Sequence, residues 1–208
     1  MNHINQLEWR YATKRMTGEK IDEASLHTIL KAIQLAPTSL GLQPFTILQI
    51  ESDEAKEKLA KACQQPQVKE SSCVLAFCAW TSFSEEKVDA YMENIATTRS
   101  LETHQLADFK KMILNFVGGL NNENFKNWAS HQAYIALGFG MYAAALEQID
   151  ATPMEGFAPA VFDEVFNLNE KGLSSVVLLA LGKRDENTDY LAKAKKVRRS
   201  HEQLYISL

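Results

Sequence analysis

The stretch AYIALGFGMYAAAL, residues 133–146, is apolar around almost its whole helical circumference. It lies inside a helix predicted over residues 126–148. A helix that spans a bilayer needs about 20 apolar residues, so this shorter stretch indicates a helix buried in a core or in a subunit interface. Gly138 and Gly140 would let a neighbouring helix or ring approach it closely.

Three further stretches predict strands around this helix. Residues 74–80 (VLAFCAW) and 174–181 (SSVVLLAL) are continuous apolar runs, which is typical of strands buried on both faces, and Gly182 ends the second run. Residues 45–50 (FTILQI) predict another strand, and residues 152–157 predict a loop or a strand end.

Helices are predicted between these strands. The clearest, residues 22–36, has apolar side chains at helical spacing, Asp22 as its N-cap and Pro37 directly after it. Other helices are expected at residues 3–14, 53–63 and 159–166.

Two segments lie outside this core pattern. Residues 85–124 are mainly helical and more polar, which indicates a helical excursion from the core. Residues 184–208 form a charged arm with an apolar end, LYISL, which indicates docking, with a second subunit as one candidate surface. No internal repeat or linker interrupts the chain, so a single domain over residues 1–208 is predicted.

The composition argues against several classes of function. Of the 208 residues, 46% are hydrophobic and 23% charged, and the net charge of −4 gives no basic footprint for nucleic acid. The polar start predicts no signal peptide, and nothing predicts a membrane association. Cys63, Cys73 and Cys78 are best explained as free thiols in the cytoplasm. The five scattered histidines predict no metal site.

Several polar segments are candidates for binding. Arg10 and Lys14, on one face of the predicted first helix, are either an anion clamp or a solvated basic face. The loop 37–44 either presents hydroxyl and N–H donors to a ligand or simply joins a helix to a strand. Lys196 and Arg198 either grip a phosphate or belong to a solubilising tail.

One more turn has the same ambiguity. Gly156, in the sequence Pro153-Met154-Glu155-Gly156, permits the close approach of a planar ligand to the backbone, or it belongs to an ordinary turn before a helix.

Together and in this order, the segments resemble the FMN-dependent nitroreductase family. The resemblance extends from Arg10 to Arg198, and although each motif is short, the collinear set is fairly specific. The motifs are R-x-x-T-K at residues 10–14, A-P-T-S-x-x-x-Q-P-F at 36–45, Q-P-Q-V at 65–68, W-x-x-x-Q at 128–132, P-M-E-G-F at 153–157 and K-V-R at 196–198.

The resemblance implies a fold and an assembly. The expected fold is α+β, with a sheet that is mixed, mostly antiparallel and sandwiched by helices. Two chains would form an intertwined homodimer, with residues 126–148 at the interface and the arm reaching across to the partner. Two equivalent FMN molecules would lie at the interface.

The resemblance also implies roles for the cationic residues. Arg10 matches the family arginine near the ribityl chain and phosphate, and Lys196 with Arg198 matches the phosphate-binding pair. Lys14 matches a lysine near flavin N1 and O2, where it would stabilise the negative charge that develops when hydride arrives at N5.

Other matches surround the flavin ring. Glu155 and Gly156 match the backbone stretch over N5, and with Lys14 they form the expected catalytic group. Residues 37–39 match a ring-side loop from the second subunit, and Gln64 and Gln67 match polar ring contacts. The loop residues are Pro37, Thr38 and Ser39; the remaining expected cofactor contacts are Tyr11, Ala12, Gly41, Gln132, Pro153 and Met154.

Three positions depart from the family pattern. Some members have lysine in place of Gln67, many have serine in place of Ala12, and many have asparagine in place of Gly41. FMN binding is still expected in spite of these differences. Because of them, however, a relative's reduction potential or substrate preference cannot be assigned to this chain.

The predicted activity is the oxidation of NADH or NADPH with reduction of a small electrophile, such as a nitroaromatic or a quinone. The two substrates would use the same ring face in ping-pong order, without a G-x-G-x-x-G motif. Leu114, Phe116 and Phe125 are candidates for the substrate pocket wall, although each could instead pack the excursion against the core.

Two alternatives remain open at this point. One is a flavoprotein of the same fold with different chemistry, such as dehalogenation, substrate dehydrogenation or flavin destruction. The other is a non-enzymatic dimeric binding protein, in which the basic residues are only solvated.

Overall fold

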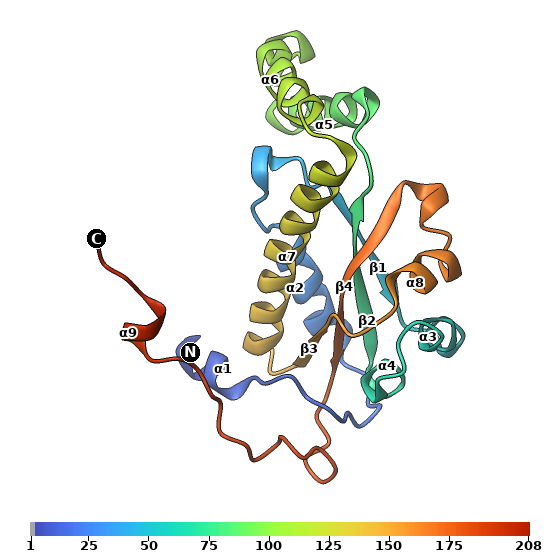
Figure 1. Cartoon of the computed structure of the whole chain (residues 1–208), viewed down its shortest axis with the longest axis vertical. Helices are drawn as coiled ribbons and strands as arrows, with labels where there is room; N and C mark the ends of the chain where they lie inside the picture. Colours follow the sequence, from blue (N-terminus) through green and yellow to red (C-terminus); the bar gives the residue numbers. More distant parts are fainter. Residues whose placement is uncertain (1–2) are drawn as a thin grey trace.

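The computed structural model describes residues 3–208, and its centre is a four-stranded sheet (Figure 1). The strands are β1 (Phe45–Ile50), β2 (Cys73–Trp80), β3 (Asp150–Met154) and β4 (Leu173–Gly182). Their order is β1-β2-β4-β3, and every neighbouring pair is antiparallel. The α+β class is confirmed. The expected mixed character is not seen, because the sheet within residues 3–208 contains no parallel pair.

The alternating faces of the strands build two apolar cores. In β2, Leu75 and Phe77 face one core, whereas Val74 and Ala76 face the other. Both faces are covered, so β2 is buried along almost its whole length. This two-sided burial explains why the strand is a continuous apolar run in the sequence.

One face of the sheet is covered by α2 (Glu23–Gln34) and α7 (Asn122–Leu146) (Figure 1). Asp22 caps α2 as predicted, because its carboxylate accepts a hydrogen bond from Ser25 N at 2.8 Å. The helix α7 begins four residues before the predicted start, because Asn121 caps it by accepting from Asn124 N at 2.8 Å.

Gly140 is where α7 approaches α2 most tightly. A Cβ on Gly140 would lie 2.9 Å from Cγ1 of Ile33, which is itself buried. Glycine therefore appears in the middle of a helix, in spite of its poor helix propensity, because a side chain there would overlap α2.

We expect Gly140→Ala to lower the free energy of unfolding by about 1–3 kcal/mol, through overpacking. Urea unfolding would measure the change. The control is Gly118→Ala, where the added Cβ would meet Phe83 at an ordinary 3.8 Å. Equal effects of the two substitutions would contradict the packing explanation.

The opposite face of the sheet is covered by three shorter helices. They are α3 (Asp53–Ala60), α4 (Pro66–Glu70) and α8 (Pro159–Val165). The sequence predicted the first and the third, but it gave no signal for α4, which has only five residues.

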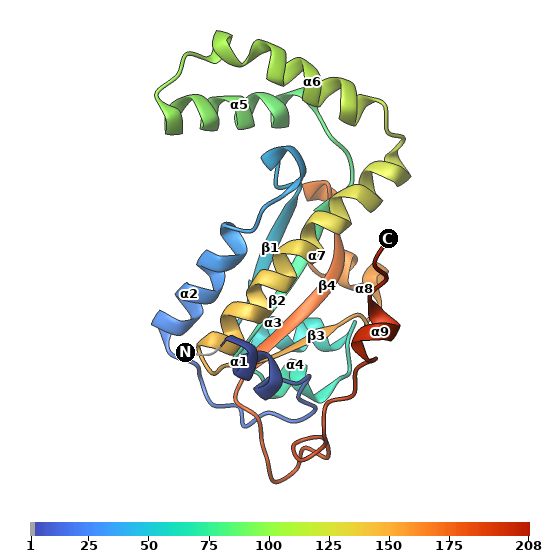
Figure 2. The ribbon, with the colours of Figure 1, turned by 90° about the vertical axis from the view of Figure 1, so that its left-hand side faces the viewer.

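The predicted excursion forms two helices beyond the end of the sheet, α5 (Glu85–Arg99) and α6 (Ala107–Gly118) (Figure 2). They pack on the first turns of α7 through a third apolar cluster, which includes Ile113, Val117 and Phe125. Short 3₁₀ turns occur at η1 (Ser39–Gly41), η2 (Thr103–Leu106) and η3 (Asn169–Lys171).

The N-terminal prediction was wrong in part. The first helix, α1, covers only His3–Trp9, and residues 10–14 are not helical. Thr13 is fully buried there, and its carbonyl oxygen accepts from Gln67 Nε2 at 2.8 Å and from Thr152 Oγ1 at 3.0 Å. Because these distant partners hold the backbone, Arg10 and Lys14 do not share a helix face.

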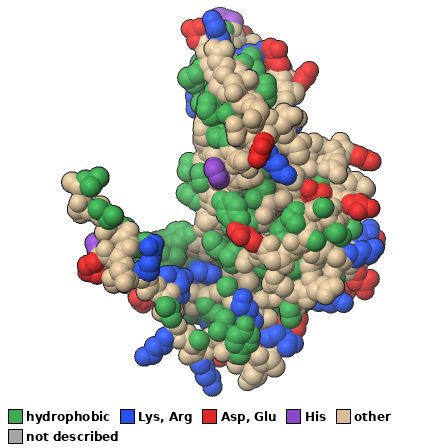
Figure 3. All heavy atoms as spheres, in the orientation of Figure 1, with side chains coloured by type: hydrophobic (Ala, Val, Ile, Leu, Met, Phe, Trp, Pro, Cys, Tyr) green, Lys and Arg blue, Asp and Glu red, His purple; other side chains and the backbone are tan. Residues whose placement is uncertain are grey.

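The C-terminal arm leaves the sheet after β4 and carries one short helix, α9 (His201–Leu204). Residues 193–208 are all exposed. In Figure 3 the arm stands away from the body and ends in hydrophobic side chains. Ile206, for example, is 87% exposed.

Candidate functional site

A cavity of about 550 Å³ lies where the non-helical segment 10–14, β3 and the C-terminal arm meet. Seven of the predicted cofactor contacts line it, although they come from three segments that are far apart in the chain. They are Arg10, Tyr11, Ala12, Lys14, Pro153, Lys196 and Arg198.

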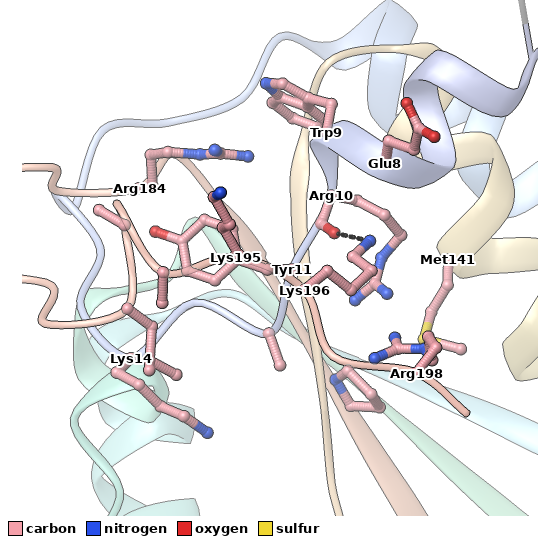
Figure 4. Close-up of a pocket in the computed structure, with 15 residues that line it drawn as sticks. Glu8, Trp9, Arg10, Tyr11, Lys14, Met141, Arg184, Lys195, Lys196 and Arg198 are labelled. Carbon is pink, nitrogen blue, oxygen red and sulfur yellow. Dashed lines mark hydrogen bonds between the residues drawn. The ribbon is translucent and has the colours of Figure 1, made fainter. Parts of the chain in front are cut away.

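The cavity is strongly cationic. Figure 4 shows Arg10, Lys196 and Arg198 gathered on one side of it, with Lys14 on the other. Burial, and then the charge of Arg198, lower the pKa of Arg10. Burial, and then the charges of Arg10 and Arg198, lower the pKa of Lys196. The three cations therefore repel one another, and a bound anion would relieve that repulsion.

Backbone carbonyl groups help to fix two of these cations. Lys196 Nζ donates to the carbonyl oxygen of Arg10 at 2.6 Å and also to that of Leu7. Arg10 Nη2 donates to the carbonyl oxygen of Ala151, beside the cavity, at 3.3 Å. Arg10 Nε is buried and has no hydrogen-bond partner among the described residues.

Asp189, at the start of the arm, holds segment 10–14 in place. Its Oδ2 accepts from Lys14 N at 2.7 Å, from Tyr11 Oη at 3.1 Å and from Arg15 N at 3.4 Å, and its Oδ1 accepts from Leu191 N at 2.8 Å. Asp189 is only 5% exposed. Burial alone would raise the pKa of Asp189, but these donated hydrogen bonds outweigh it, and the pKa lies below its ordinary value.

We expect Asp189→Asn to lower the free energy of unfolding at pH 7 by about 1–2 kcal/mol, because neutral donor–acceptor pairs replace charge-assisted ones. The folded pKa lies below the unfolded value of about 3.9. The difference in the free energy of unfolding between wild type and variant is therefore largest above that pH. It disappears as the pH falls through the folded pKa.

Urea unfolding at a series of pH values would measure this difference. Glu186→Gln is the matched control, because Glu186 is an exposed carboxylate three residues away. A difference that stays constant into acid would contradict the assignment of the charge to Asp189.

A second anchor lies beside the first. Arg184 and Asp150 form an ion pair with an Nη2–Oδ1 distance of 2.6 Å, and both side chains are largely buried. The Arg184 guanidinium lies between two aromatic rings, 4.2 Å from the centroid of Trp9 and 4.7 Å from that of Tyr11. The Asp150 carboxylate neutralises Arg184, so Arg184 does not supply free positive charge to the cavity.

The remaining predicted contacts near this end surround the turn after β3. Glu155 and Gly156 are exposed, and Met154 is buried beneath them. Gln64 is exposed. Gln67 is 2% exposed, and its Oε1 has no hydrogen-bond partner among the described residues.

The loop residues that follow α2 lie elsewhere. Ser39 N donates to Oε1 of buried Gln132, on α7, at 2.8 Å, so Gln132 fixes this loop. Gly41 has a φ of +69°, and a Cβ there would overlap the hydroxyl of Tyr91 on α5. Pro37 and Thr38 belong to the same loop, and none of these residues lines the cationic cavity.

The predicted pocket-wall residues have different environments. Phe116 is 43% exposed and packs edge-on against Trp128. Leu114 is half-buried. Phe125 is 1% exposed, with its ring between Phe83 and Trp128. Phe125 thus supports the excursion from within, which is the packing alternative.

One chain therefore brings together two separate groups of predicted residues. The cation group surrounds the cavity, and the loop group lies near the start of α7. Sequence reasoning missed Asp189 and Tyr134, and it included Gln65 only as the first residue of the Q-P-Q-V motif, without a role. The contacts of these three residues join positions far apart in the chain, so no local pattern could reveal them.

Two features are absent from residues 3–208. No helix there has the length and apolarity needed to cross a bilayer. No group of three or more His, Cys, Asp or Glu side chains there could hold a metal ion.

An antiparallel sheet between two helical layers, with a cationic cavity between chain ends, defines an α+β protein that can bind a phosphorylated ligand. Comparison with known proteins makes this class specific. The model of the nitroreductase family matches residues 7–183, and the chain belongs to that family.

Individual relatives and a solved structure are consistent with this family assignment. The chain is 31% identical to the major NAD(P)H-flavin oxidoreductase of Aliivibrio fischeri, over 96% of this chain and 95% of that one. It is 24% identical to the oxygen-insensitive NAD(P)H nitroreductase of Enterobacter cloacae, over 82% and 81% of the two chains. A protein of Exiguobacterium sibiricum, classed as a nitroreductase and solved in complex with FMN, shares the fold with a TM-score of 0.83 and 22% identity, over 100% and 98% of the chains.

Proposed function

We propose that this protein is an FMN-dependent oxidoreductase that uses NADH or NADPH to reduce nitroaromatics, quinones or similar small electrophiles. The observation that carries the proposal is the cavity at which Arg10, Lys196 and Arg198 converge without enough opposing charge. Family membership and the names of the relatives support the same activity.

The residues present fit FMN. The cavity volume of about 550 Å³ falls within the range of roughly 300–1,000 Å³ that is usual for cofactor sites. Arg10 Nε is a buried donor without a partner among the described residues, as expected beside a missing phosphate or hydroxyl acceptor. An arginine and a lysine that repel each other are a suitable donor set for a phosphate dianion.

The chain's residues would have distinct tasks. Arg10, Lys196 and Arg198 would hold the phosphate end, and Lys14 would place positive charge near the pyrimidine edge of the ring. Bound FMN would supply the hydride acceptor and donor, which no side chain can provide. Asp189 would keep Lys14 in place through its backbone N–H.

The donor and the acceptor would use the same open side of the site in turn. This arrangement requires no separate dinucleotide-binding domain, in agreement with a sequence that has no G-x-G-x-x-G motif.

We further propose a homodimer in which α7 lies at the interface and each arm extends onto the partner. Ile135 and Phe139 on α7 and Leu7 on α1 are large apolar side chains that are about 40% exposed. The apolar end of the arm is more exposed still. A two-fold assembly would cover these surfaces, and it could bring the loop group of one chain to the cation group of the other.

We also propose a single domain and a cellular location for this protein. A single domain over the whole chain accounts for one sheet that contacts all three apolar clusters. The buried, unpaired thiols of Cys63, Cys73 and Cys78 support a reducing compartment, and we propose the cytoplasm.

The deciding experiment is an absorption spectrum of the purified protein with FMN, followed by anaerobic addition of NADH and then NADPH. Flavin bands that bleach with either nucleotide would support the proposal and identify the donor. Bands that do not bleach would favour different chemistry on the same fold. Failure to retain FMN would refute it.

A further inference from the structure

The turn that follows β3 is held from two other elements. Gly156 O accepts from Gln65 Nε2 at 3.0 Å and lies 3.7 Å from Cys63 Sγ. The hydroxyl of Tyr134, on α7, donates to Oε1 of Glu155 at 2.5 Å. The turn is therefore fixed both from the segment before α4 and from the long helix α7.

These contacts leave one backbone donor free. Within the turn, Glu155 O accepts from Phe157 N at 2.9 Å. The Gly156 N–H points away from that carbonyl oxygen, because the two belong to one trans peptide. It donates to no acceptor within the described part of the chain. With the peptides on both sides of Gly156 held, the direction of this N–H is set.

We propose that Gln65 and Tyr134 are positioning residues, which hold the Glu155–Gly156 turn so that the free N–H of Gly156 faces the reacting end of the bound cofactor. This inference rests on the proposed function, because the resemblance, and not a bound ligand, assigns the turn to the flavin. A donor held in advance costs no reorganisation during the reaction.

Gln65 is free to serve this purpose. It is the N-cap residue of α4, but its side chain makes no capping hydrogen bond. Its amide instead reaches the turn, and it lies so close that a Cβ on Gly156 would be only 2.8 Å from Gln65 Nε2. Glycine at 156 and glutamine at 65 are therefore sterically matched.

Tyr134 fixes the side chain of Glu155, which is next to the N–H of Gly156 in the chain. A carboxylate left free beside an unpaired N–H is a strong competing acceptor. The tyrosine hydroxyl ties Oε1 of Glu155 to α7. Burial, and then the hydrogen bond to Glu155, raise the pKa of Tyr134 to about 12, so the hydroxyl keeps its proton at neutral pH.

The test uses Gln65→Met and Tyr134→Phe, which remove the polar groups and keep side-chain volume. The control is Tyr142→Phe on the same helix, whose hydroxyl contacts His3 instead of the turn. In the FMN-loaded protein, we expect hydride transfer from the preferred nucleotide to slow about tenfold in each test variant. The Kd for FMN should change less than about twofold, and the control should match wild type.

A second readout does not depend on activity. The chain has nine glycines, so selective ¹⁵N-glycine labelling gives a simple amide spectrum, in which Gly156→Ala identifies the Gly156 signal. Titration of apoprotein with FMN should shift this signal strongly in wild type and in Tyr142→Phe. The shift should be reduced in Gln65→Met and Tyr134→Phe.

The outcomes separate the two proposals. If FMN binds and is reduced, but the test variants transfer hydride at the wild-type rate with the wild-type Gly156 shift, the positioning role is overturned and the proposed function stands. If FMN binds but neither nucleotide reduces it, the proposed function fails and the Gly156 shift alone decides the inference. If FMN does not bind at all, both fail.

Discussion

Replacing Lys196 and Arg198 together by alanine is expected to weaken FMN binding by about 100-fold or more. Each side chain would contribute a charge-assisted hydrogen bond to the phosphate, worth about 1.5–3 kcal/mol. A loss of about 1.4 kcal/mol is a factor of ten in Kd. The Kd can be measured by titrating apoprotein into FMN and following the quenching of flavin fluorescence.

The control for this prediction removes the same charge from the same arm. Lys193 and Arg199 do not line the cavity, so Lys193→Ala with Arg199→Ala should change the Kd by less than about threefold, the part due to long-range attraction alone. Riboflavin, which lacks the phosphate, should bind wild type and the Lys196/Arg198 variant similarly. Equal losses in both double variants would mean that the arm acts only through its net charge.

Introducing glutamate at Ile135 and at Phe139 is expected to separate the subunits and to remove FMN binding with them. Both side chains lie on the exposed face of α7 and are about 40% exposed in the single chain. A carboxylate buried without a partner at a subunit interface costs several kcal/mol, so two such residues should raise the dimer dissociation constant by at least about 100-fold.

Sedimentation velocity across a dilution series would measure this assembly, and the Kd for FMN would be determined on the same samples. Met112→Glu is the control, because Met112 is 49% exposed on α6, away from the α7 face. A monomer that still binds FMN with wild-type affinity would show that one chain contains the complete site. A variant that remains dimeric would place the interface elsewhere.

The sequence predicted the core strands well, because their pattern depends on local burial. Residues 45–50 match β1, and the apolar runs at 74–80 and 174–181 match β2 and β4 to within one residue at each end. The short strand β3 was ambiguous, since it contains a proline and has only five residues.

The candidate site was less predictable, because its shape depends on contacts between distant residues. The spacing of Arg10 and Lys14 indicated a helix, but Asp189, 175 residues after Lys14, binds the Lys14 N–H in a non-helical segment. The motif order identified the cations around the cavity without showing how they converge. The Q-P-Q-V motif contains Gln65 but gives no indication of its contact with the turn after β3. Tyr134 carries no local signal, because a tyrosine on an apolar helix is common for other reasons.

The joining of the two chain ends at the cavity has a consequence for biosynthesis. Arg10 leaves the ribosome before Lys196, which binds its carbonyl oxygen and follows 186 residues later. The sheet and its helices can therefore collapse during translation, whereas the phosphate side of the cavity closes only after residues 196–198 have emerged. A polypeptide that stops before residue 196 would lack this side of the cavity and would be colourless. Flavin colour in a cell extract would therefore report only chains translated at least as far as Arg198.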